Sequence, residues 1–401
     1  MKKVLLLAIL AMSCVFGFSA PEILPIKHGP GFDHTAMDKN LHQYLRDCDS
    51  PALEDVSVLL RHGANPNSKS DMDATPLMIA AGKCDASIVR LLLDNHAQIN
   101  AKDSAGWTPI MYAACYSNDE VIRLLASRGA DLNARSNNGW SPMHFAAAHG
   151  NAETIRLLAS LGCNANEISE EGLTPLHYAV CVKNADPNRI KALCDSGAMV
   201  NRGASGTTPL IKAIQNANPQ VAEILIKAGA NLKAKDKDGL SAILHAAGSE
   251  SPLSGRMIRL LARSGADMSD TDNSNGNALI IAVRKGNPES VKALIDLHCN
   301  PDSIDDYGRT ALIVAISQTK ANQLEIIKAL LKAKANANAK DITGKSALMY
   351  AIDSGDCEIA SLLVQSGADT KARDLYGNSV FSYAAATGNE KMIDSIFSTI
   401  I

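Results

Sequence analysis

Aromatic residues are scarce in this sequence. They make up 4% of the 401 residues, although hydrophobic residues as a whole reach 46%. Large aromatic side chains dominate most thick protein cores, so this composition favours many small, closely packed helices over one large core. An excess of positive charge is also absent, because the formal net charge is −3 at pH 7. Nucleic-acid-binding proteins usually carry a basic stripe, and we therefore expect no nucleic-acid partner.

Motifs of the common enzyme and metal-site classes are missing. The sequence contains no His-Glu-x-x-His, no Cys-x-x-Cys and no Gly-x-Ser-x-Gly, which would mark zinc sites or a hydrolase nucleophile. Gly344-Lys345-Ser346 resembles the end of a phosphate-binding loop, but the Gly that this loop requires five residues earlier is Ala339. We expect no catalytic residues, no cofactor and no metal. An envelope hydrolase or metal-binding protein stays open as an alternative.

A long apolar run occurs only at the N-terminus. Lys2 and Lys3 precede an apolar stretch over 4–18, and the small residues Gly17 and Ser19 follow at its end. A membrane helix needs about 20 apolar residues, so this shorter run with a small-residue cleavage site predicts a secretory signal peptide over 1–19. We expect an exported protein, periplasmic or secreted, with no membrane insertion after cleavage.

Two further features concern the same end of the chain. Lipoprotein processing at Cys14 is a weaker alternative to signal-peptide cleavage, because the three residues before it fit the usual Leu-small-small pattern poorly. Residues 20–39 contain several Pro and Gly without periodicity, which indicates a flexible leader. No Asn-x-Ser/Thr glycosylation sequon is present, and this favours a bacterial source.

The rest of the chain repeats. Gly172-Leu173-Thr174-Pro175-Leu176-His177-Tyr178-Ala179 has counterparts 33 and 66 residues earlier, beginning at Gly139 and Gly106. Such a period indicates an array of supersecondary units. The Thr-Pro-Leu position recurs at Thr75, Thr108, Ser141, Thr174, Thr208, Ser241, Asn277, Thr310, Ser346 and Ser379.

Each unit encodes two helices and a turn. Thr108 can cap a helix that begins at Pro109, where the missing N–H costs nothing. An apolar stripe over 121–125 predicts a second helix, which Gly129 ends. Ser136 to Gly139 then forms a tight turn before the next unit. Each unit leaves an apolar side that only its neighbour can cover.

These motifs resemble those of the ankyrin repeat family. The residues that carry the resemblance are Thr174–Ala179 (Thr-Pro-Leu-His-x-Ala), Gly129–Asn133 (Gly-Ala-Asp-Leu-Asn), and Asp-x-x-Gly at Asp103, Asp236, Asp305, Asp341 and Asp374. The resemblance implies an all-α solenoid of about eleven helix-turn-helix units with projecting β-hairpin-like loops. It would span 40–401, with an N-terminal cap over 40–70 and a C-terminal cap over 374–401.

The sequence departs from the family pattern in its second half. From Ser241 onward the Pro is replaced, four times by Ala and finally by Val380. Ala is a good helix former, so the helices should survive. Two units are three residues longer, and we place the insertions between their two helices, at 249–255 and 318–323.

The resemblance also indicates where a partner would bind. In the family, contacts concentrate on the hairpin tips and on the exposed end of each first helix, along the concave face. The positions that match the hairpin tips are Trp107, Trp140, Tyr307, Arg309 and Tyr376. The positions that match the first-helix ends include Tyr116, His149, Arg284 and Lys285.

Two interpretations of this surface stay open. Trp107, Tyr116, Trp140 and His149 fall on adjacent units and could form one aromatic contact patch, since aromatic residues are enriched at interface hot spots. Alternatively, the tryptophans only pack against the neighbouring hairpin. We predict a non-enzymatic, monomeric scaffold that binds a protein partner outside the cytosol; a self-associating structural stack is a further alternative.

Several histidines and cysteines have simpler interpretations. His144 and His177 occupy the motif histidine position, where a hydrogen bond within the turn is expected. Nine cysteines are present, and Cys14 would leave with the signal peptide. Cys115 and Cys181 hold the same position two units apart, too far for a disulfide. We therefore expect most of these thiols to act as small core fillers.

Overall fold

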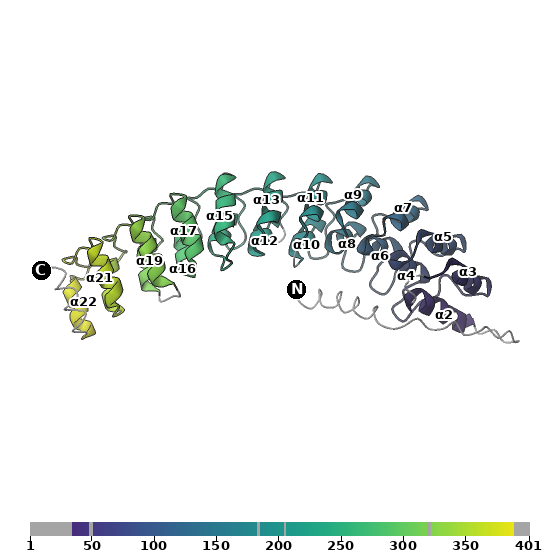
Figure 1. Cartoon of the computed structure of the whole chain (residues 1–401), viewed down its shortest axis with the longest axis horizontal. Coiled ribbons are helices and arrows are strands. Elements are labelled where there is room, and N and C mark those ends of the chain that lie inside the picture. Colours follow the sequence, from purple (N-terminus) through teal and green to yellow (C-terminus); the bar gives the residue numbers. More distant parts are fainter. Residues whose placement is uncertain (1–33, 48–50, 183–184, 204–205, 319–321, 389–401) are drawn as a thin grey trace. The chain divides into compact units, whose positions relative to one another are not determined.

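The computed structural model describes residues 34–47, 51–182, 185–203, 206–318 and 322–388. The predicted signal peptide, Cys14 and most of the predicted leader lie outside these ranges. Within them the chain forms 21 helices, and Figure 1 shows them as successive pairs. The chain divides into two compact units, 1–199 and 200–401, which we call unit 1 and unit 2.

Unit 1 contains five helix pairs. Their helices are α2 (His34–Asp47), α3 (Leu53–Arg61), α4 (Pro76–Lys83), α5 (Ala86–Asp94), α6 (Pro109–Tyr116), α7 (Asp119–Ser127), α8 (Pro142–Ala148), α9 (Ala152–Ser160), α10 (Pro175–Cys181) and α11 (Pro187–Asp195). The first helices of neighbouring pairs pack side by side, as do the second helices. This packing gives one continuous apolar layer within the unit, because each pair covers the apolar side of the next.

Unit 2 contains five further pairs and one additional first helix. They are α12 (Pro209–Gln215), α13 (Pro219–Lys227), α14 (Ala242–Ala247), α15 (Ser254–Arg263), α16 (Ala278–Lys285), α17 (Pro288–Asp296), α18 (Ala311–Ser317), α19 (Gln323–Lys332), α20 (Ala347–Asp353), α21 (Cys357–Gln365) and α22 (Val380–Thr387). The first helices survive the loss of Pro, as the sequence predicts. The second helix expected after α22 lies outside the described residues.

The ten Thr-Pro-Leu positions are the N-caps of the first helices α4 to α22. In α8 the Ser141 N–H donates to His144 Nδ1 over 3.1 Å. Met111 provides the same acceptor in α6, where the Thr108 N–H lies 3.4 Å from its sulfur. Where Ile stands three residues after the N-cap, the side chain of the N-cap residue accepts a hydrogen bond from the Ile N–H, as Thr310 does from Ile313. The predicted turn hydrogen bond of His144 and His177 is therefore confirmed.

The loops between pairs form short hairpin turns, which we call fingers. In the finger of Asp305, the carboxylate Oδ1 accepts the N–H groups of Tyr307 and Arg309, both over 3.0 Å. Isolated antiparallel bridges such as Ile304 with Thr310 close the base of the unit 2 fingers. Gly308 has φ +68°, and a Cβ there would lie 2.9 Å from the Ile342 nitrogen, so only glycine fits.

Neighbouring fingers are joined by backbone hydrogen bonds. In unit 1 the Asn137 N–H donates to Ala105 O over 3.0 Å. In unit 2 the Ile342 N–H donates to Tyr307 O, and the Leu375 N–H to Thr343 O, each over 3.0 Å. These bonds satisfy polar groups that the exposed tips would otherwise leave to water, and they fix the spacing of the tips.

Asparagine side chains in the loops after the second helices join neighbouring helix pairs in the same way. Asn100 Oδ1 accepts the Asp131 N–H over 2.8 Å, and Asn338 Oδ1 accepts the Asp369 N–H over 2.7 Å. Asn338 also donates to Gly367 O over 3.0 Å. The asparagines that follow these second helices therefore join each helix pair to the next within a unit.

Helix α2 begins at His34, inside the segment assigned to the flexible leader over 20–39. The helix extends into this segment because no Pro or Gly lies between Gly31 and Pro51 and the buried Leu41 and Leu45 anchor it. Most of each predicted insertion falls in the connection between α14 and α15 or between α18 and α19, although residues 319–321 lie outside the described ranges.

The cysteines only partly follow the core-filler interpretation. Cys84, Cys115 and Cys163 are buried. Cys181 is exposed, and Cys194 is half-buried. Burial raises the pKa of Cys115 to about 12, so this thiol stays protonated and inert at neutral pH.

Candidate functional site

A row of aromatic side chains crosses the first helices of unit 1. Phe145 on α8 is buried, with 1% of its surface exposed. The rings of Trp107 and Trp140 pack edge-on against it, with centroids at 4.5 and 5.2 Å. Tyr112 contacts Trp107 at 5.4 Å, and Tyr178 contacts Trp140 at 4.4 Å. These five residues form what we call the aromatic row.

The row explains why both tryptophans are half-buried. Trp107 and Trp140 precede successive first helices, so their rings reach the neighbouring helix and enclose Phe145 between them. Edge-to-face pairs of this kind contribute about 0.5–1.5 kcal/mol each beyond burial. Much of the surface of both tryptophans is therefore buried against neighbouring rings of the stack. Only the rest of each ring is accessible to a partner.

His149 adds a polar group to the exposed side of the row. Its ring stacks on Trp140 at 6.4 Å, with an interplanar angle of 26°. Burial, followed by the charge of Arg189, lowers the pKa of His149, so the ring is mostly neutral at pH 7. Arg189 itself is buried and donates to the Ala147 and Ala148 carbonyls at the end of α8.

Tyr116 lies at the corresponding end of α6 and is 37% exposed. A Cβ at Gly82 would lie 3.0 Å from the Tyr116 ring, so the ring packs over that glycine. Of the four residues predicted to form one patch, the structure joins Trp107, Trp140 and His149 through direct contacts or through Phe145. Within the described residues, Tyr116 has no ring contact with them.

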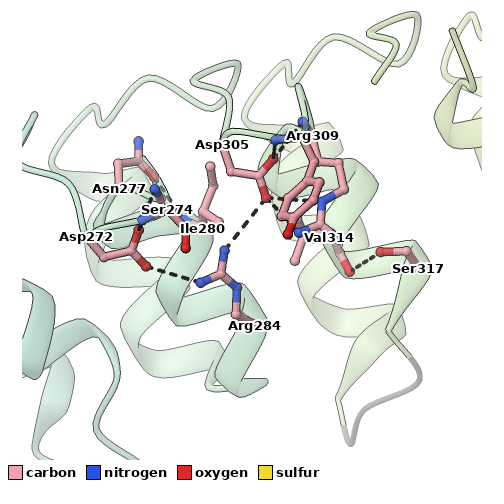
Figure 2. A network of polar contacts seen from close by, with 11 residues as sticks. Asp272, Ser274, Asn277, Ile280, Arg284, Asp305, Arg309, Val314 and Ser317 are labelled. Carbon is pink, nitrogen blue, oxygen red and sulfur yellow. Dashed lines mark hydrogen bonds and ion pairs between the residues drawn. The ribbon is translucent and has the colours of Figure 1, made fainter. Parts of the chain in front are cut away.

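The candidate residues of unit 2 divide into two groups. Figure 2 shows that Arg309 and Arg284 both reach Asp305. Arg309 donates to Asp305 Oδ2 from Nε over 3.1 Å and from Nη2 over 2.8 Å. Arg284 bridges Asp272, at 3.2 Å, and Asp305, at 3.7 Å. The Asp305 side chain is fully buried, with 0% exposed.

The two arginines therefore have a structural task. A buried carboxylate needs charged and hydrogen-bonding partners to offset its desolvation. Asp305 obtains them from two backbone N–H groups and both arginines. The guanidinium of Arg309 also lies over the Tyr307 ring, 4.7 Å from its centroid. Lys285, the neighbour of Arg284, is exposed to solvent at the end of α16.

The tyrosines of unit 2 are more accessible. Tyr307 is 56% exposed and Tyr376 is 80% exposed, both at fingertips. Their apolar neighbours, Ile342 and Leu375, are 61% and 75% exposed and were not predicted from the sequence. Phe145, Tyr112 and Tyr178 were not predicted either, although their shared spacing, four residues after each N-cap, was the available signal.

A cleft in unit 2, about 320 Å³ in volume, is lined by Pro219, Glu223, Arg256, Arg259, Leu260 and Arg263. Glu223 there already pairs with Lys227 over 2.8 Å. The described residues contain no cluster of three or more His, Cys, Asp or Glu suited to a metal, and none of their helices is long and apolar enough to cross a membrane.

Comparison with known proteins identifies the family. The model described as ankyrin repeats (3 copies) matches residues 42–136, 133–202, 180–272, 244–341 and 319–399. The chain therefore belongs to the ankyrin repeat family, and its helix pairs with projecting fingers are the ankyrin fold. Ankyrin repeats generally act as non-enzymatic interaction modules, so membership indicates a protein-binding scaffold.

Among solved structures, the chain is similar to the crystal structure of the ankyrin repeat domain of Bcl-3, described as a unique member of the IkappaB protein family. The TM-score is 0.51 at 29% sequence identity, and the match covers 56% of this chain and 99% of that chain. A search of the curated proteins gave no match.

Proposed function

We propose that this protein is a non-enzymatic scaffold that holds a protein partner outside the cytosol, on the face formed by its fingers and first-helix ends. The observation that carries the proposal is the pair of first-helix ends in unit 1. Tyr116 is exposed at the end of α6. At the end of α8, in the next helix pair, His149 is stacked on Trp140. Preorganised aromatic rings gain contact area on binding at a small entropic cost.

The other candidate residues lie on unit 2. Lys285, Tyr307 and Tyr376 are exposed on unit 2 and can contact a partner directly. Arg284 and Arg309 position the finger of Asp305, so they would act through that finger's geometry. The chain acts as a monomer in this proposal. The N-terminal apolar run with its small-residue cleavage site supports export, periplasmic or secreted.

The test uses the chain as bait against the envelope fraction of the cells that make it. Tyr116→Ala with His149→Ala should weaken capture of the partner at least about tenfold, the range of interface hot spots. Arg123→Ala with Arg156→Ala, two exposed positions on second helices, is the matched control and should capture normally. Unchanged capture by the first pair, with an intact thermal transition, contradicts the proposed surface.

The same cell fractions test whether the protein is exported. An N-terminal peptide that begins at Ala20 supports export with signal cleavage. A chain that retains Met1 and is recovered with the cytosolic fraction contradicts it.

A further inference from the structure

Three consecutive fingers of unit 2 carry large apolar side chains at their tips. The two residues after the finger aspartates are Asp306-Tyr307, Ile342-Thr343 and Leu375-Tyr376. The side chains of Tyr307, Ile342, Leu375 and Tyr376 are 56 to 80% exposed. We call these four residues the fingertip ridge. The two preceding described fingers of unit 2 hold polar residues there, Lys237-Asp238 and Asn273-Ser274.

The ridge is continuous and held in place. The Ile342 N–H bonds Tyr307 O and the Leu375 N–H bonds Thr343 O, so each tip is fixed to the next. The finger aspartates Asp341 and Asp374 also accept the hydroxyls of Tyr350 and Tyr383 over 2.6 and 2.9 Å, which anchors each finger to its own first helix. A contiguous exposed apolar surface on an ordered framework marks an interaction site.

The charges beside the ridge favour an acidic partner. Lys340 and Arg373 stand on the finger arms next to Ile342 and Leu375, and both are exposed. They are neighbours, because Lys340 Nζ donates to Arg373 O over 2.9 Å. Arg373 Nη1 donates to Gly377 O over 2.7 Å. Each cation keeps further N–H groups for a carboxylate. The one exposed acid at a tip of the ridge, Asp306, lies at its opposite end.

The distance between successive fingertips indicates which backbone conformation a bound segment has. Packed helices lie about 8–10 Å apart, so equivalent tips recur at about that spacing. A polyproline II segment rises about 3.1 Å per residue and has three residues per turn, so every third side chain advances about 9 Å along one face. A β-strand turns alternate side chains away and would place every third residue on the opposite face.

We propose that the fingertip ridge binds an extended protein segment in the polyproline II conformation. This segment carries bulky apolar side chains at every third position, and a carboxylate that pairs with Lys340 and Arg373. The proposal deepens the scaffold function above by naming the partner's chemistry at a second surface. It does not depend on Tyr116 or His149, so the two can fail separately.

The experiment selects 12-residue peptides from a random displayed library on the full chain and measures their binding by fluorescence polarisation. Selected peptides should carry apolar residues at i, i+3 and i+6 with Asp or Glu nearby. They should bind the triple variant Ile342→Ser, Leu375→Ser, Tyr376→Ser at least tenfold more weakly. These side chains are mostly exposed, so the variant should keep the wild-type thermal transition.

A matched control removes exposed apolar side chains elsewhere: Met72→Ser, Met199→Ser, Leu253→Ser. It should bind the peptides normally. Peptides that bind the ridge variant within twofold of wild type, that lack the three-residue spacing, or that are rich in Lys and Arg overturn the proposal, as does a selection that yields no binder. The wild-type chain and the ridge variant are also tested for binding to vesicles of phosphatidylglycerol and phosphatidylcholine. If only the wild-type chain binds, the ridge is a membrane-binding surface and the proposal is overturned.

Discussion

At the scale of single residues, His144 joins three parts of unit 1. Its Nδ1 accepts from Ser141 at the start of α8, and its Nε2 lies 3.2 Å from the Leu173 carbonyl of the next finger. It also contacts Trp140 and Tyr178 of the aromatic row. Burial lowers its pKa to about 4, from an ordinary value of 6.5.

This shift makes unit 1 sensitive to acid. Because the folded-state pKa lies below the unfolded one, the neutral ring stabilises the fold above pH 6.5, and this contribution is lost as pH falls from 6.5 to about 4. The loss between pH 7 and pH 4 should be about 3 kcal/mol. His144→Met, which copies Met111 at the same position, should remove most of this dependence in urea unfolding measured at both pH values. Equal pH dependence in the two proteins contradicts the assignment.

Arg309 is the residue at which a structural and a binding role can be separated. It satisfies the buried carboxylate of Asp305 through two hydrogen bonds. Arg309→Ala should therefore lower the free energy of unfolding by about 2–3 kcal/mol, since it removes a main partner of a buried charge. Tyr307→Ala, which removes only the ring beneath the guanidinium, should cost less than about 1 kcal/mol. Arg309→Ala with wild-type stability in chemical denaturation would show that its role lies in partner contact alone.

At the scale of helices, the second helices end in a common way. A residue in the left-handed conformation follows each helix, and glycine occupies this place after α7 and α21, with φ +87° at Gly129 and +88° at Gly367. Lys334 holds it after α19 with φ +64°. A side chain costs about 1 kcal/mol in this conformation, whereas glycine adopts it freely.

Lys334→Gly should therefore stabilise unit 2 by about 0.5–1 kcal/mol, seen as a higher thermal midpoint. Lys332→Gly provides the control two residues earlier, inside the last turn of α19. It should lower stability by a similar amount, because glycine is unfavourable within a helix. A lower midpoint for Lys334→Gly would contradict the cap assignment.

The helices were the part of the structure most accessible from sequence. Each first helix begins at a capping residue whose spacing is visible in the chain, from Thr75 to Ser379, and local chemistry alone places it. The ring contacts around Phe145 were less accessible, because they depend on which neighbouring finger a Trp reaches. Ile342 and Leu375 were missed for a related reason: an apolar residue beside a finger aspartate resembles a core residue until the finger is placed in space.

At the largest scale, each helix pair has two distinct exposed sides. The fingers and first-helix ends carry the aromatic row, Tyr116 and the fingertip ridge, whereas exposed positions on second helices hold charged residues such as Arg123 and Arg156. A scaffold that binds through extended shape complementarity requires no catalytic pocket. It does require that the partner contact the side of the fingers and first-helix ends and not the side of the second helices.

Site-specific photo-crosslinking in the cells that produce the protein shows which of the two sides contacts the partner. A photoreactive side chain placed at His149 or Tyr116 should form a covalent adduct with one defined protein, and the same side chain at Arg123 or Arg156 should not. Adducts of equal yield at all four positions, or adducts only at the second-helix positions, would contradict the account.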